Sequence, residues 1–151
     1  MILQRLRQET SSYHKQIEGG LDICDEYLTL AGYKNILANF LGFYLPVEQM
    51  LGLLQAGEIL QTEVAQRRKT PLLLQDLRAL GLADMQMLPT CTDLPMLENV
   101  FQALGCMYVL EGATLGGQII ARHVQRKLHV DEKNGCAFFN GYGCDTGKMW
   151  K

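Results

Sequence analysis

Hydrophobic residues recur at intervals of three and four positions along most of this chain, and no pair of segments has the alternating pattern of β-strands. This spacing predicts an all-α protein. The first helix is expected over residues 2–18, and Gly19-Gly20 ends it. The apolar stripe of that helix consists of Leu3, Leu6, Thr10, Tyr13 and Ile17.

Further helical segments follow before a connector. Thr29 is the predicted N-cap of the second helix, in which Pro46 causes a kink or a break, and the helix ends near Gln55 or beyond. Helical spacing continues over residues 58–68. A short helix is expected over residues 71–80, with a proline in its first turn.

The longest predicted helix begins after a connector over residues 82–93. Asp93 is its expected N-cap, and the apolar pattern continues to about Leu128. Beyond Val130 the pattern weakens, and residues 137–143 form either another helix or a loop.

Three glycines lie inside this long helix, where a packed helix favours alanine or leucine: Gly112, Gly116 and Gly117. Each costs about 0.5–1 kcal/mol relative to alanine, so together they cost roughly 1.5–3 kcal/mol of helix stability. Gly112 and Gly116 are one turn apart and share a face, which opens a shallow trough for a neighbouring helix or a flat ligand. The pair Gly116-Gly117 also favours a bend.

Composition indicates one domain over residues 1–151, because a hydrophobic content of 48% supports a single ordinary core. The net charge of −2 gives no electrostatic basis for binding nucleic acid or an acidic membrane. The amino terminus lacks a signal-peptide pattern and no uninterrupted apolar segment of membrane length follows, so we expect a cytoplasmic protein. The five cysteines are scattered without a Cys-x-x-Cys motif, which argues against a disulfide framework and structural zinc.

Of the three histidines, His14 is the best candidate for a ligand. At about 100° per residue, Arg7, His14 and Glu18 form one row along the first helix. His14 suits an iron ligand whose second ring N–H is accepted by Glu18. Arg7, roughly 10.5 Å along the helix, suits a carboxylate at the rim of a large planar ligand. The alternative is a partly buried histidine beside ordinary surface charges.

Other candidate positions have structural alternatives of equal or greater weight. His123 lies on the face of Gly116 and is expected to be a core or rim residue, whereas His129 at the helix end complements the helix dipole. Tyr108, one turn before Gly112, either donates to a ligand carboxylate or is a core tyrosine.

The last turns of the long helix also carry positive charge. We expect Arg122, Arg126 and Lys127 to form a solvated face that complements the dipole, and contact with an anionic ligand or a redox partner is the alternative. Motifs of other classes are missing: the Glu-x-x-His pairs of di-iron bundles, the phosphate-binding Gly-x-Gly-x-x-Gly and the Gly-x-Ser-x-Gly nucleophile elbow.

Two segments resemble the heme oxygenases, particularly the bacterial members that supply biliverdin to phytochromes. Residues 6–18 resemble the family's first helix with its proximal histidine, and residues 108–118 resemble its distal helix. Their order and spacing, with Phe138-Phe139 and Tyr142-Gly143 downstream, extend the resemblance over nearly the whole chain. Neither motif is specific alone, but the pair is.

The resemblance implies a multi-helix bundle that holds heme between the first helix and a glycine-kinked distal helix. O₂ and electrons would open the ring and release biliverdin, CO and ferrous iron. His14 would be the axial iron ligand and Glu18 its partner. Arg7 and Tyr108 would hold the propionates.

The same resemblance gives the glycines a catalytic role. With no side chain at Gly112 and Gly116, the distal helix can lie close over the iron and direct O₂ toward a meso carbon of the ring, and Gly117 belongs to the same heme-binding segment. A ferredoxin-like or other external reductase would donate the electrons. A downstream phytochrome is an expected user of the product.

Two positions depart from the family pattern. Mammalian-type members carry an aspartate after the first distal glycine, which orders the water of the proton relay, and Ala113 occupies that position here. Many bacterial relatives also lack this acid and use backbone groups and water. Family members typically continue for several helical turns beyond Trp150-Lys151, so the resemblance implies a shortened carboxyl end, an open side of the pocket and exposed apolar surface that favours a homodimer.

Two alternative functions fit the same sequence. A heme-binding or heme-delivering protein without turnover agrees with Ala113 and with the early end of the chain. A helical interaction module needs no cofactor, because the glycines would then admit another helix. Replacing His14 by alanine discriminates between them, since it abolishes histidine-ligated heme only in a heme protein.

Overall fold

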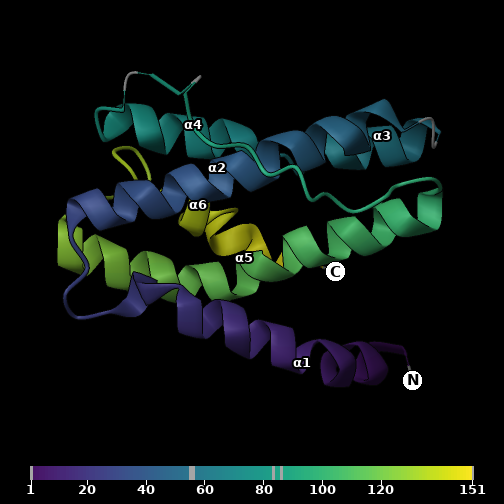
Figure 1. The fold of residues 1–151 in the computed structure, drawn as a ribbon, viewed down its shortest axis with the longest axis horizontal. Coiled ribbons are helices and arrows are strands. Elements are labelled where there is room, and N and C mark those ends of the chain that lie inside the picture. The colour runs from purple at the N-terminus through teal and green to yellow at the C-terminus, as the bar shows by residue number, and fades with distance from the viewer. Residues whose placement is uncertain (1, 55–56, 83, 86, 151) are drawn as a thin grey trace.

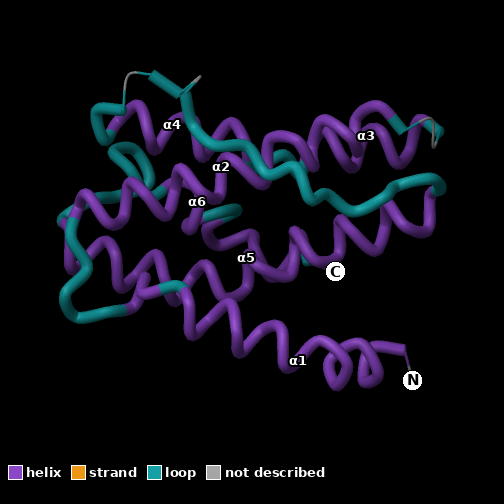
Figure 2. The backbone as a smooth tube through the Cα atoms, viewed as in Figure 1, coloured by secondary structure: helices purple, strands orange, loops and turns teal. Residues whose placement is uncertain are grey.

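A computed structural model describes residues 2–54, 57–82, 84–85 and 87–150, and the regular structure of these residues is entirely helical (Figures 1 and 2). The predicted all-α fold is confirmed. The elements in chain order are α1 (Ile2–Gly20), η1 (Asp22–Cys24), α2 (Leu30–Leu53), α3 (Glu58–Gln66), α4 (Thr70–Ala79), α5 (Val100–Leu128), α6 (Ala137–Asn140), η2 (Gly143–Asp145) and α7 (Thr146–Met149).

The first two helices begin and end close to the predicted residues. α1 includes Gly19 and Gly20, two residues beyond the expected end. Thr29 caps α2 as predicted, because its side chain accepts a hydrogen bond from the N–H of Gly32 at 3.1 Å. Between the two helices the chain passes through η1, which packs against α5.

Pro46 lies inside α2 and does not end the helix. Because proline has no N–H, the carbonyl of Gly42, one turn earlier, has no partner within the helix. The N–H of Cys91 donates to that carbonyl at 2.9 Å, so the connector between α4 and α5 replaces the missing bond as it runs along α2 (Figure 2). A Cβ at Gly42 would lie 2.2 Å from the carbonyl oxygen of Pro89, so glycine is what lets the connector approach.

The hydrophobic core lies between α2, α4, α5 and α6. Side chains without solvent exposure come from α2 at Tyr33, Leu37 and Val47, and from α4 at Leu73 and Leu77. The aromatic residues of α6 extend this core toward α2. Its ring contacts join Phe138 and Phe139 to Phe40 and Tyr44.

The position of the short helix α6 depends on Asp76 of α4. Both oxygens of this buried carboxyl accept backbone hydrogen bonds, from the N–H of Ala137 at 2.7 Å and of Phe138 at 2.8 Å. Burial raises the pKa of Asp76 to about 6, although the two hydrogen bonds act in the opposite direction. The hydroxyl of Tyr33 holds the preceding turn by donating to the carbonyl of Gly135 at 2.9 Å.

The start of α5 differs from the prediction of Asp93. Asn99 is the N-cap, and its side chain accepts from the N–H groups of Phe101 and Gln102, both at 3.0 Å. Residues 89–98 have no regular structure, and Leu94 and Leu97 are partly buried from a non-helical conformation, whereas Met96 is exposed. The leucines of the connector that pack against the core are Leu82, Leu88, Leu94 and Leu97. Leu94 and Leu97 are three positions apart, so they imitate the apolar stripe of a helix.

By length and composition alone, α2 and α5 could each cross a membrane. In the described structure α2 is the central core helix, and soluble core helices meet the same criterion. α5 differs from α2, because much of its apolar surface is exposed.

Candidate functional site

The surface of α5 at Gly112 and Gly116, where the sequence predicted a trough, is open in the structure. Among described atoms, a Cβ at Gly116 would meet nothing within 4 Å, and one at Gly112 would meet Cη2 of Trp150 at 3.8 Å. We call this surface, centred on Gly112 and Gly116, the glycine face. Exposed apolar side chains of α5 lie along the same helix: Phe101, Leu104, Tyr108, Val109, Leu115 and Ile119. An open apolar surface that lacks two side chains fits a flat hydrophobic ligand.

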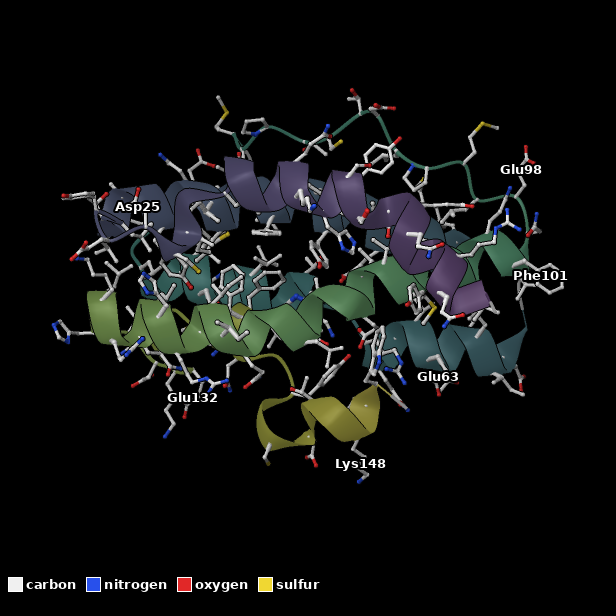
Figure 3. All side chains as sticks on the ribbon, turned by 90° about the horizontal axis from the view of Figure 1, so that it is seen from below. Asp25, Glu63, Glu98, Phe101, Glu132 and Lys148 are labelled. Carbon is white, nitrogen blue, oxygen red and sulfur yellow. The ribbon has the colours of Figure 1, made fainter. Side chains whose placement is uncertain are left out.

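At its carboxyl-terminal end, the glycine face reaches the segment that follows η1. α1 and α2 lie on opposite sides of α5 in Figure 1. His123 lies two turns after Gly116 on the same face, and its Nε2 is 3.4 Å from the carbonyl oxygen of Asp25, just after η1. Figure 3 shows Asp25 beside the last turns of α5. The exposed side chains of Tyr13 and Ile17 give α1 an uncovered apolar surface as well.

His14 occupies an exposed position on α1. The side chains of Arg7 and Glu18 lie outside the described residues, so of the predicted row only His14 can be placed. Among the described residues, no group of three or more His, Cys, Asp and Glu side chains could hold a metal ion. A porphyrin iron needs fewer protein ligands, because the macrocycle supplies most of its coordination. Iron ligation by His14 remains a prediction.

Tyr108 and Trp150 border the glycine face. The ring of Tyr108 packs against that of Trp150 with the centroids 5.4 Å apart. Trp150 follows α7, so the carboxyl-terminal segment covers one edge of the face at Gly112. Tyr108 is 38% exposed. Its role as a propionate ligand stays a prediction.

The structure gives Gly117 a different role from the predicted one in heme binding. Gly117 is buried, and a Cβ there would lie 2.9 Å from the carbonyl oxygen of Phe139. Next to it, Nε2 of Gln118 donates to the carbonyl of Asn140 at 2.6 Å. The missing side chain of Gly117 therefore admits α6 to the back of α5, and we do not include Gly117 in the ligand-facing surface.

The basic residues at the end of α5 form the solvated face that the sequence predicted. Arg122, Arg126 and Lys127 are exposed, and Nε of each arginine donates to a carbonyl of the preceding turn. His129 is also exposed and ends the helix in the left-handed region, at φ 55°. A surface hollow of about 500 Å³ lies beside this face and is lined by Ile119, Arg122, Gln125 and Arg126.

A buried group of charges behind α5 was missed by the sequence interpretation. Its centre is Glu111, which is 7% exposed and directly precedes Gly112. The carboxylate accepts from Nζ of Lys69 at 2.8 Å, from Nη1 of Arg67 at 3.3 Å and from the hydroxyl of Tyr142 at 2.9 and 3.0 Å. We call Glu111, Arg67, Lys69 and Tyr142 the ionic cluster. The sequence held one signal for this cluster: Glu111 lies in an apolar stretch and has no basic residue three or four positions away to pair with.

Burial shifts the pKa values of two groups in the ionic cluster. It lowers the pKa of Lys69, although the hydrogen bond to Glu111 acts in the opposite direction. It raises the pKa of the Tyr142 hydroxyl, and the hydrogen bond to Glu111 adds to that increase. Nζ of Lys69 also lies 3.9 Å from the centroid of the Tyr142 ring, a cation–π geometry. The cluster is therefore desolvated and mutually paired.

A family model described as heme oxygenase matches residues 1–151. The chain belongs to the heme oxygenase family. No curated protein and no solved structure gives a significant match. The all-helical fold agrees with membership of the heme oxygenase family, and this membership implies heme as the ligand. The glycine face suits heme, because a flat apolar macrocycle needs a helix surface that side chains do not obstruct.

Proposed function

We propose that this protein is a heme oxygenase that cleaves heme to biliverdin, CO and ferrous iron, using O₂ and electrons from an external reductant. The observation that carries the proposal is the open glycine face in a chain whose full length matches the family. Heme itself supplies the oxygen chemistry when it is bound. The protein supplies a ligand for the iron, an apolar surface and the orientation of the ring.

In this proposal, His14 is the axial ligand from α1, and Glu18 accepts its second ring N–H and fixes the tautomer. Arg7 and Tyr108 hold the propionates, with Tyr108 at the border of the glycine face. Gly112 completes the surface over which the ring lies. Arg7 and Tyr108 thus place polar groups at the edge of heme, His14 places one at the iron, and the rest of the ring is left to apolar contact.

Gly112 and Gly116 decide how closely α5 approaches the ring. An alanine at Gly116 would have free space in the protein without heme, so the absence of a side chain there has no packing reason among the described residues. The helix nevertheless loses about 0.5–1 kcal/mol by having glycine there. A ligand that needs the backbone close by explains this loss, whereas protein packing explains Gly117.

The proton supply in this proposal relies on water and backbone groups. Ala113 is exposed and has no group that exchanges protons. Glu111 is buried and is bonded to the ionic cluster on the other side of α5, so it does not replace an acid at Ala113. In this proposal, an ordered water held by backbone carbonyls of the glycine segment supplies the proton.

Hemin titration followed by a reductant tests the function. Purified protein should give a saturable one-to-one Soret band, and adding a reductant in air with catalase present should convert the band to the spectrum of biliverdin. A stable Soret band would favour heme binding or delivery without turnover. Absence of saturable binding would contradict the proposal and leave a helical interaction module.

Matched substitutions connect the result to the proposed site. His14→Ala should abolish the spectrum of histidine-ligated heme, whereas His129→Asn, at an exposed helix end, should leave it unchanged. Gly116→Leu should block heme binding or redirect cleavage. Gly52→Leu is its control, because Gly52 is also exposed inside a helix and also has free space around its Cβ position.

The cellular setting follows from the same proposal. We place the protein in the cytoplasm, with a ferredoxin-like or other reductase as electron donor and a phytochrome as user of the biliverdin. The exposed apolar side chains of α1 and α5 support a homodimer in the absence of heme. Light scattering with and without hemin would measure that assembly directly.

A further inference from the structure

The ionic cluster joins three parts of the chain at the back of α5. Arg67 follows α3, Lys69 precedes α4 and Tyr142 precedes η2, and all of them donate to Glu111 on α5. Both carboxylate oxygens are used, and the acceptor is 7% exposed. Charge-assisted hydrogen bonds in a buried setting are short-range and directional. This arrangement therefore restricts both the position of α5 and its rotation about its own axis.

The cluster acts where the helix itself is weakest. Gly112 follows Glu111 directly, and Gly116 is just over one turn further along. Glycine residues lower helix stability, so α5 needs external support at this point to keep one conformation. Adjacent residues in a helix point about 100° apart, so a side chain anchored at Glu111 sets the direction in which the glycine face points.

The cluster also reaches the border of the glycine face through Arg67. Nη1 of Arg67 donates to the carbonyl of Met149 at 2.8 Å. Trp150, the next residue, lies against Tyr108 and 3.8 Å from the Cβ position of Gly112. The same guanidinium therefore holds the back of α5 and the segment that covers one edge of its front.

We propose that Glu111 is a positioning residue that orients the glycine face over bound heme through its bonds to Arg67, Lys69 and Tyr142. This inference rests on the proposed function, since it assigns Glu111 a role in presenting α5 to heme. Glu111 does not touch heme; it acts through the backbone of Gly112 and Gly116.

Hydrogen exchange on the protein without heme tests the support of α5. Glu111→Gln keeps the shape of the side chain but removes the charge that Lys69 and Arg67 pair with. Amides of residues 108–118 should exchange at least 10-fold faster in this variant. Glu63→Gln is the matched control, because Glu63 also accepts from Arg67, at 2.9 Å, but it lies on α3 and is more exposed. Exchange in residues 108–118 should be unchanged there.

Hemin-loaded protein tests the positioning itself. Glu111→Gln should keep the hemin dissociation constant within about 3-fold of the unaltered protein. It should nevertheless change the electron paramagnetic resonance signature of the ferric complex and the ratio of biliverdin isomers. Tyr142→Phe should produce the same changes to a smaller extent, since it removes one donor and leaves the charges, and it remains informative if Glu111→Gln does not fold.

The outcomes separate the two proposals. Failure of the unaltered protein to bind hemin would overturn the proposed function. Normal hemin binding, with exchange, resonance signature and isomer ratio in Glu111→Gln and Tyr142→Phe equal to those of the unaltered protein, would overturn only the positioning role of Glu111.

Discussion

Adjacent glycines of α5 should respond in opposite ways to the same added methyl group. In the protein without heme, Gly116→Ala places Cβ in open space, whereas Gly117→Ala places it 2.9 Å from the carbonyl oxygen of Phe139. Both substitutions remove the entropic cost of glycine, which is worth about 0.5–1 kcal/mol in a helix. The difference between them therefore measures packing against α6.

The expected magnitudes follow from these distances. Gly116→Ala should raise the free energy of unfolding by about 0.5–1 kcal/mol. For Gly117→Ala the Phe139 carbonyl must retreat to reach ordinary contact, which begins at 3.4 Å. That carbonyl has little freedom, because Asp76 binds the start of α6 and Gln118 binds its end. Overpacking of this kind costs about 1–3 kcal/mol, so the net effect should be a loss of about 1–2 kcal/mol.

Urea unfolding of the protein without heme, followed by circular dichroism, measures both changes. With a slope of about 2 kcal/mol per molar urea, the midpoint should rise by about 0.4 M for Gly116→Ala and fall by about 0.5–1 M for Gly117→Ala. Hemin affinity should follow the reverse order: Gly116→Ala binds more weakly and Gly117→Ala binds normally. Shifts of the midpoint in the same direction would refute the assignment of the two faces of α5.

Three further predictions concern the contacts that position α6 and the connector between α4 and α5. Burial raises the pKa of Asp76 to about 6, so the unfolded chain releases this proton at lower pH than the folded protein does. The free energy of unfolding, relative to that of Asp76→Asn, should therefore fall by up to about 3 kcal/mol as the pH rises from about 4 to 6. Urea midpoints measured across this range check the prediction. Gly42→Ala should lower the free energy of unfolding by about 2 kcal/mol or more, because its Cβ would lie 2.2 Å from the carbonyl oxygen of Pro89. A melting temperature equal to that of the unaltered protein would contradict this close approach. Tyr33→Phe should cost about 1–2 kcal/mol in a thermal melt through loss of the bond to the Gly135 carbonyl, and a variant as stable as the unaltered protein would show that this bond adds nothing.

Local physical chemistry accounts for what was predictable in the fold. Thr29 was identified as an N-cap because a side chain that accepts its own helix's N–H acts within one turn. Apolar spacing located α1, α3, α4 and the end of α5 near Leu128, since an amphipathic helix repeats its pattern wherever it packs. The trough at Gly112 and Gly116 was predictable for the same reason, because residues four apart share a face in any helix.

The failures arose where a distant segment supplies the partner. Leucines of the connector have helical spacing but pack from irregular chain, which moved the start of α5 from Asp93 to Asn99. Of the two outcomes predicted for Pro46, a kink or a break, the break did not occur, since the connector donates to the carbonyl that proline leaves free. The bond between Cys91 and Gly42 joins residues 49 positions apart, and the connector leucines pack against a core built by other helices, so no local pattern encodes either outcome.

The sequence by itself determined that this chain is helical and that one helix surface lacks side chains, and it predicts His14 as the iron ligand. Only the tertiary structure decided that Gly117 serves α6 while Gly116 remains open, because neighbouring residues of a helix face different partners. It alone revealed Glu111 as the centre of a buried cluster. A carboxylate acquires that role from donors brought to it by folding, and the donors lie 31 to 44 positions away along the chain.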